Sequence, residues 1–265
     1  MEQLEKLVHV LGFLGFEKSP DQAIRKIKFW SYEVQAHILQ AQFQQPLEKL
    51  NCLRKFLFEE KNLHCDPENK TSDCFSFEKL IDSKKGPFLN LALLLRTLAS
   101  DLTLQLEMIR VADHRWMKWI ADQKNEYLDL ADKARTLNPD EVLQRIVQSS
   151  LNSNATTNDD FKPLCFKDCL IAYLGPLEMF YKKQDQRTQL LKIYDLLLKV
   201  SPSSLRALSE RALLLLDLGE RKEAHQDLKR YFYLSDERTT NPDLKYLFDI
   251  LNREADLNSP PLQFH

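Results

Sequence analysis

Glycine is scarce in this chain, with only five copies among 265 residues. Phosphate-binding loops of the GxGxxG or GxxxxGKS type need several glycines within one turn, and neither pattern is present. The longest apolar run, LALLLRTLA, is interrupted by Arg96 and is far shorter than the roughly 20 residues that cross a bilayer. No basic cluster precedes the apolar LVHVLGFLGF near the N-terminus. We therefore expect a cytoplasmic protein without a glycine-rich nucleotide loop or a membrane span.

An excess of charge of one sign is also missing, and the cysteines are few and irregularly spaced. The 37 basic and 39 acidic residues leave a formal net charge of -2, so we expect no nucleic-acid partner. Five cysteines are an odd number, which argues against a disulfide framework. Cys165 and Cys169 share a helical face without further soft ligands nearby, and His64, Cys65 and Cys74 are better explained as ordinary side chains. We expect no metal and no cofactor.

The first 148 residues combine two kinds of hydrophobic spacing. Steps of three and four residues predict three helices in the first sixty residues, an apolar helix at 89–100 and a helix from Pro139. Shorter runs of extended type follow the apolar helix. The predicted strands are 104–111, 114–121 and 126–130, with a turn at 122–125, and residues 61–75 are predicted to be a loop. This pattern is typical of an α+β unit in which helices pack against a small antiparallel sheet.

Residues 149–162 are rich in serine, asparagine, threonine and aspartate and are predicted to be a linker. From 163 to 257 the spacing becomes helical throughout, with an internal repeat of 34 residues that ends at Pro202. Gly219 stands at the turn of the second unit, where Asp185 stands in the first. Small residues at the crossing of two helices and large ones along the ridge are typical of a tetratricopeptide hairpin. A capping helix is predicted at 241–252.

The order of these parts resembles a known bacterial family. The segments are LEKLNCLRKFLFEEKNL, then KKGPFLNLALLLRTLASDLTLQLEMIRVADH, then YLDLAD, and finally AHQDLKRYFYLS. Together they are similar, from about residue 20 to 255, to the first member of the SirB family. That family joins a transglutaminase-like, papain-like domain to tetratricopeptide repeats. The resemblance implies a degenerate transglutaminase-like α+β domain followed by an all-α repeat domain.

The resemblance also implies where catalytic residues would stand. His114 and Asp129 match the family's histidine and aspartate, although Asp113 and Leu130-Ala131-Asp132 depart from the glycines and proline that usually flank them. In active relatives a cysteine begins the helix two residues after a glycine. Counting from Gly86 reaches Phe88, which has neither a titratable proton nor a lone pair to donate. We therefore expect no catalytic residues, with His114 and Asp129 remaining as a structural pair.

Tetratricopeptide arrays bind peptides through a groove lined by the first helix of each hairpin. The register predicts that the following residues face such a groove: Met179, Lys182, Lys183, Arg206, Ser209, Glu210 and Leu213. Lysine and arginine there are suited to a peptide carboxylate, although a simple solvated charged face is the alternative.

Three functions remain open from the sequence. The first is a non-catalytic interaction or scaffold protein that binds a protein or peptide partner through the groove. The second is a cysteine-type amidase, protease or acyl transferase with an unrecognised nucleophile. The third is a regulator that binds a small ligand in the pocket around His114 and Asp129. The oligomeric state does not follow from the sequence.

Overall fold

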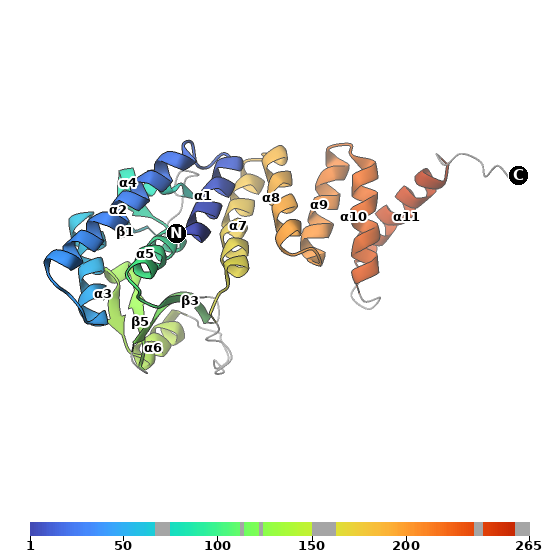
Figure 1. Cartoon of the computed structure of the whole chain (residues 1–265). Helices are drawn as coiled ribbons and strands as arrows, with labels where there is room; N and C mark the ends of the chain where they lie inside the picture. Colours follow the sequence, from blue (N-terminus) through green and yellow to red (C-terminus); the bar gives the residue numbers. More distant parts are fainter. Residues whose placement is uncertain (67–74, 112–113, 122–123, 150–162, 236–240, 258–265) are drawn as a thin grey trace, which may run out of the picture. The chain divides into compact units, whose positions relative to one another are not determined.

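The computed structural model describes residues 1–66, 75–111, 114–121, 124–149, 163–235 and 241–257 (Figure 1). The chain divides into two compact units, Met1–Leu170 and Ile171–His265. We predicted the boundary at residues 149–162, and residues 150–162 lie outside the described part of the chain. The predicted linker therefore stays a prediction, and the two compact units meet within the helix Phe166–Lys183.

Unit 1 is built mainly from helices. Their bounds are α1 Glu2–Phe13, α2 Pro20–Gln40, α3 Pro46–Lys55, the π-helical η1 Phe56–Glu60, α4 Phe77–Ser83, α5 Phe88–Asp101 and α6 Pro139–Ser149. The three predicted N-terminal helices are confirmed, with prolines in the first turns of α2 and α3. A proline fits there because the first backbone N–H groups of a helix have no intrahelical acceptor. Helix α4 was missed, because seven residues are too few to show a periodicity.

Two sheets lie among these helices. A short parallel pair joins β1, His64–Cys65, to β2, Lys85–Gly86. The larger sheet is antiparallel and has the order β3-β4-β5-β6. Its strands are Leu106–Val111, His114–Ala121, Lys124–Asp129 and Arg135–Leu137, and a short 3₁₀ turn η3, Leu130–Asp132, separates the last two. The predicted α+β class is therefore confirmed.

The structure corrects the sequence-based assignment at three places around these strands. The predicted loop 61–75 contains β1, the predicted turn 122–125 overlaps the start of β5 at Lys124, and β6 had not been predicted. Strands of two or three residues are too short to show alternating apolar and polar residues in the sequence. Pairing with other segments of the chain determines where they form.

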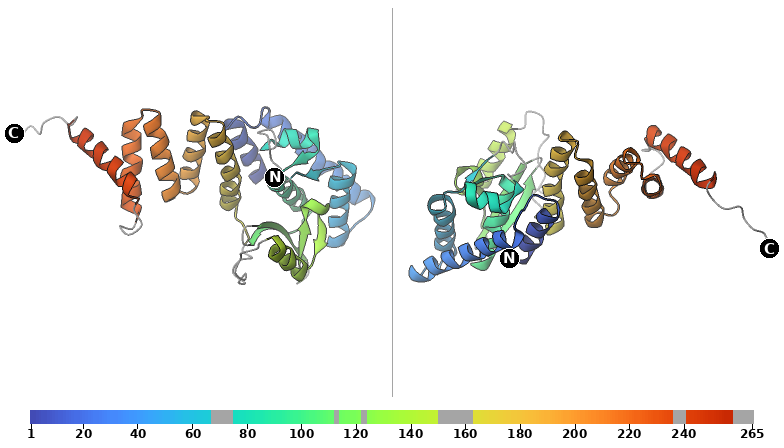
Figure 2. Two further views of the ribbon diagram at one scale, coloured as in Figure 1. Left: turned by 180° about the vertical axis from the view of Figure 1, so that it is seen from behind. Right: turned by 90° about the horizontal axis from the view of Figure 1, so that it is seen from above.

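The two faces of the larger sheet are covered by different helices. Met108, Met117 and Leu128 are in register across three strands and are fully buried on one face. The other face carries a cluster of Ile109, Tyr127 and Leu137 that packs against Val142 of α6. Figures 1 and 2 show α5 and α6 on opposite sides of these strands. Strand alternation also puts the two tryptophans on opposite faces: Trp119 is buried, and Trp116 is partly buried against the α6 cluster.

Unit 2 is entirely helical in its described part. From Ile171 onward it contains most of α7, Phe166–Lys183, and all of α8 Arg187–Val200, α9 Leu205–Asp217, α10 Arg221–Leu234 and α11 Pro242–Leu257. Within the described residues of the whole chain, no helix combines the length and apolarity needed to cross a membrane.

The helices of unit 2 repeat at an interval of 34 residues. Asp185 and Gly219, separated by that interval, both have positive φ angles, 48° and 83°, in the turns after α7 and α9. The backbone bonds around the two turns match, because Gln186 N–H donates to Tyr181 C=O as Glu220 N–H does to Leu215 C=O. Buried pairs follow the same interval: Leu174 with Leu208, Tyr181 with Leu215, Leu190 with Ala224, and Tyr194 with Leu228.

Candidate functional site

The first residue of α5 is Phe88, the position where the resemblance implies a nucleophile. Pro87 precedes it as the N-cap residue and β2 lies directly before that. The half-buried phenyl ring offers no thiol or hydroxyl group. The next polar side chain of the helix, Asn90, is fully buried, and its amide donates to the carbonyl of Phe75 at 3.2 Å. The start of α5 is therefore held by packing and a structural hydrogen bond.

Asp129 is a buried carboxylate at the end of β5. Its Oδ1 atom accepts from the backbone N–H of Ala131 at 3.0 Å, and its Oδ2 atom receives the Arg145 guanidinium from α6. This carboxylate thus ties η3 and α6 to the end of the sheet.

His114 begins β4 opposite Val111, and its side chain lies outside the part that the structure describes. Asp113 and Cys74 fall outside the described residues as well. The predicted pairing of His114 with Asp129 therefore stays a prediction.

Cys65 is a thiol near the start of α5 that the sequence reasoning had not connected with this region. Strand β1 pairs Cys65 with Gly86, two residues before Phe88. Burial raises the pKa of the Cys65 thiol, and the carboxylates of Asp129 and Asp66 raise it further. A raised pKa keeps the thiol protonated at neutral pH, which is the less nucleophilic form. Only the strand pairing reveals this proximity, because residues 61–75 appear as a polar loop in the sequence.

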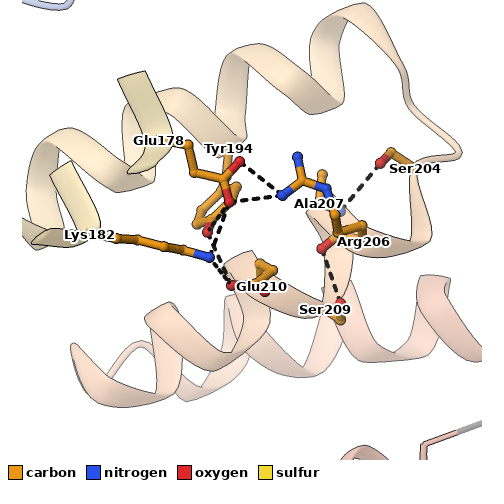
Figure 3. Close-up of polar contacts among 8 residues, drawn as sticks. All are labelled: Glu178, Lys182, Tyr194, Ser204, Arg206, Ala207, Ser209 and Glu210. Carbon is orange, nitrogen blue, oxygen red and sulfur yellow. Dashed lines mark hydrogen bonds and ion pairs between the residues drawn. The ribbon is translucent and has the colours of Figure 1, made fainter. Parts of the chain in front are cut away.

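A polar cluster in unit 2 joins several of the predicted groove residues (Figure 3). Its centre is Glu178 on α7, whose side chain is only 4% exposed. Arg206 of α9 brings one guanidinium nitrogen to within 2.8 and 2.9 Å of the two Glu178 oxygens. Lys182 lies 3.1 Å from Glu178 and 2.8 Å from Glu210. Two cations and two carboxylates therefore balance one another inside the cluster.

Tyr194 of α8 completes this cluster, with its hydroxyl 3.1 Å from both Glu178 and Glu210. Burial acts to raise the pKa of Glu178, but the hydrogen bonds and charges of Arg206 and Lys182 outweigh it, so the pKa is lowered. Burial acts to lower the pKa of Lys182, and its bonds to Glu210, Tyr194 and Glu178 reverse this, so that pKa is raised. The pKa of Tyr194 is raised, first by burial. Glu178, Lys182 and Arg206 are thus held ionised, and the phenol of Tyr194 stays neutral.

The remaining predicted groove residues lie around the cluster. Met179 and Leu213 are exposed, at 55% and 42%, and are separated by the repeat interval. Ser209 donates its hydroxyl to the backbone carbonyl of Arg206 at 3.0 Å. Lys183 is exposed at the end of α7. Of the predicted groove residues, Met179 and Leu213 are therefore exposed apolar side chains, while Lys182 and Arg206 contact carboxylates.

Glu178 and Tyr194 had not been predicted as polar site residues. Glu178 stands one repeat before Ala212, at a position where small residues meet the second helix, and Tyr194 stands one repeat before the apolar Leu228. A second network, in which Arg211 binds Asp227 at 2.6 and 2.7 Å and Asp195 at 2.6 Å, was also missed. The signal available in the sequence was a glutamate at a position that the next repeat fills with alanine.

Within the described ranges, no group of three or more histidine, cysteine, aspartate or glutamate side chains is arranged to hold a metal ion.

Comparison with known proteins gives a family-level result. A family model described as transglutaminase-like superfamily matches residues 21–170, more than half of the chain. A curated protein of Xylella fastidiosa (strain Temecula1 / ATCC 700964), named UPF0162 protein, is 24% identical over 229 residues, which cover 82% of this chain and 76% of that protein. No solved structure matches.

Proposed function

This chain belongs to the transglutaminase-like superfamily, and we propose that it is a non-catalytic interaction protein of the SirB type. In this proposal a degenerate transglutaminase-like unit carries a short tetratricopeptide-like array that binds a protein or peptide. The observation that carries the proposal is Phe88, which stands at the start of α5 in place of a nucleophile. Without a group to activate, a histidine and an aspartate nearby perform no acyl transfer.

The repeat geometry of unit 2 supports the binding part of the proposal. Two equivalent turns and four equivalent buried pairs recur at 34 residues, the period of tetratricopeptide repeats. The internal pairing of Lys182 and Arg206 argues against a simple carboxylate clamp, since a partner carboxylate would have to displace Glu178 or Glu210. The exposed Met179 and Leu213 favour a partner with apolar side chains.

We expect the double variant Met179→Glu, Leu213→Glu to lose its partner, because two carboxylates would be desolvated against apolar side chains. The measurement is affinity capture with quantitative mass spectrometry from the native cell. The control is Tyr233→Glu on α10, where the side chain is 88% exposed. Loss of a partner from the double variant alone supports binding at the groove. Identical partner sets for the wild type, the double variant and Tyr233→Glu would rule out binding there.

A second function, a cysteine-type enzyme, is favoured by one observation, the position of Cys65 beside Gly86. Alkylation by iodoacetamide separates the two functions. If Asp129 only raises the pKa of the thiol, Asp129→Asn should speed the labelling of Cys65 a few-fold at neutral pH, and His114→Ala should leave it unchanged. An enzyme with an activated thiol would react more slowly in both variants.

The buried Cys169 serves as an internal control for this labelling. It is 2% exposed, so it should stay unmodified while unit 1 is folded. Labelling of Cys169 in a variant would mean that faster reaction at Cys65 comes from unfolding. The rates are therefore compared only for proteins in which Cys169 remains protected.

A further inference from the structure

A cavity of about 470 Å³ lies in unit 1. Its walls come from the middle of α2, the residue after η1 and the end of α4. Lys26, Lys61 and Lys84 line it together with Trp30 and Asp82. The volume lies within the range of roughly 300 to 1,000 Å³ that is common for small-molecule sites.

Two of these lysines lie over one buried aromatic ring. The Nζ atom of Lys61 lies 5.6 Å from the centroid of Trp30, and the Nζ atom of Lys84 lies 5.2 Å from it. Trp30 itself is only 6% exposed. The side chains of Lys26 and Lys61 are 32% and 22% exposed, less than is usual for surface lysines. Like charges held together and partly shielded from water repel one another more strongly than they would in bulk solvent.

Carboxylates compensate only part of this positive charge. Lys26 pairs with Asp82 at 2.8 Å, and Lys61 pairs with Glu33 at 2.7 Å. Lys84 has no carboxylate within ion-pair distance among the residues that the structure describes. The group therefore keeps one excess positive charge beside an open cavity.

The backbone at Lys84 adds an independent observation. Lys84 follows the last turn of α4 with φ 64° and ψ 13°, the left-handed conformation that glycine adopts at least cost. A lysine at this position adopts the conformation with some strain, and such strain is common where a side chain has a task. In this conformation the Nζ atom of Lys84 lies over the ring of Trp30.

We propose that this cavity binds a phosphate-type anion, either a phosphorylated small molecule or the phosphorylated headgroup of a lipid. A phosphate group offers several strong acceptor oxygens and up to two negative charges. It can therefore accept from the ammonium group of Lys84 and share those of Lys26 and Lys61 with the carboxylates that they already contact. Phe29, 61% exposed at the edge of the cavity, provides an apolar contact for the remainder of the ligand.

The test uses the full chain and titrates pyrophosphate by isothermal calorimetry at low ionic strength. The main variant is Lys84→Gly, which removes the ammonium group and relieves the backbone, so a loss of binding does not come from misfolding. We expect its affinity to fall by about tenfold or more, the usual effect of removing one charged contact. The matched control is Lys85→Gln, an exposed neighbour that does not line the cavity, for which we expect little change.

Vesicles distinguish the two sources of phosphate. Cosedimentation is measured with phosphatidylcholine vesicles that contain or lack a phosphoinositide. Binding that requires the phosphoinositide and is lost in Lys84→Gly assigns the site to a lipid headgroup. Binding of pyrophosphate without vesicle binding assigns it to a soluble ligand. The proposal is overturned if the wild type binds neither pyrophosphate nor the phosphoinositide vesicles. It is also overturned if Lys85→Gln loses as much affinity as Lys84→Gly.

Discussion

Replacing Lys182 and Arg206 together by methionine is expected to lower the free energy of unfolding of unit 2 by about 3 kcal/mol. The double variant leaves Glu178, 4% exposed, with only the hydroxyl of Tyr194 as a partner inside the cluster. A buried carboxylate without a compensating cation is among the most destabilising features that a single site can have. Urea unfolding, with hydrogen exchange followed on peptides from residues 171–235, measures the change and assigns it to unit 2.

The control for this prediction removes the carboxylate as well. Ala212 occupies the equivalent position one repeat later and is fully buried, so Glu178→Ala fits the local packing. The triple variant, in which Glu178→Ala is added to the two methionines, should recover most of the stability that the double variant loses. The reason is that an apolar replacement of a whole buried ion cluster is often neutral. A triple variant as unstable as the double would mean that the methionines themselves disturb the helices.

We also expect the double variant to reverse the sign of the pH dependence of stability that Glu178 causes. In the wild type the pKa of Glu178 is lowered from 4.5, so it contributes stability that is present above that value and is lost as pH falls through its lowered pKa. In the double variant, burial acts alone and should raise that pKa above 4.5. The contribution of Glu178 then falls as pH rises through this region. The measurement is the urea midpoint between pH 3 and 7, from which the midpoint of the matched protein carrying Glu178→Ala is subtracted. As pH rises, this difference should increase in the wild type and decrease in the double variant.

The sequence predicted the long, periodic elements of this fold well. Helices α2 and α5 and the strands β3 and β4 follow from apolar spacing, because each buries one face or both along many residues. Short elements were missed for the opposite reason. Seven residues in α4 and two in β1 carry too little pattern, and their conformation depends on contacts made far away in the chain.

The candidate sites were predictable only in part. Phe88 could be located by counting from Gly86, and the structure places it at the first residue of α5. The repeat register assigned Lys182, Arg206 and Glu210 to one groove, and that assignment stays a prediction. In the structure Lys182 contacts Glu210, and Arg206 contacts Glu178. The unusual position of Glu178 was visible in the sequence, but its partners on two other helices were not, because contacts between distant helices leave no local pattern. The cavity at Trp30 likewise joins three segments that are distant in sequence.

The other large effect is expected at Glu17, a carboxylate that is 3% exposed at the start of α4. Its oxygens accept from the backbone N–H groups of Phe77 at 2.7 Å and Glu78 at 3.0 Å and from the Ser76 hydroxyl at 3.0 Å. Glu17→Ala removes three charge-assisted hydrogen bonds and leaves buried donors without partners. We expect the free energy of unfolding of unit 1 to fall by about 3 kcal/mol, measured by urea titration of tryptophan fluorescence, because all three tryptophans lie in unit 1.

An exposed carboxylate at another helix start provides the comparison. Asp21 lies in the first turn of α2 and is exposed, so Asp21→Asn should cost less than about 1 kcal/mol.

The pH dependence of stability that Glu17 causes should have the opposite sign to that of Glu178 in the wild type. Burial raises its pKa above 4.5 against the three hydrogen bonds, so its contribution decreases as pH rises from 4.5 through the folded-state pKa. The Glu17→Gln variant should lose this slope, and an unchanged slope would show that α4 does not depend on the charge at its N-terminus.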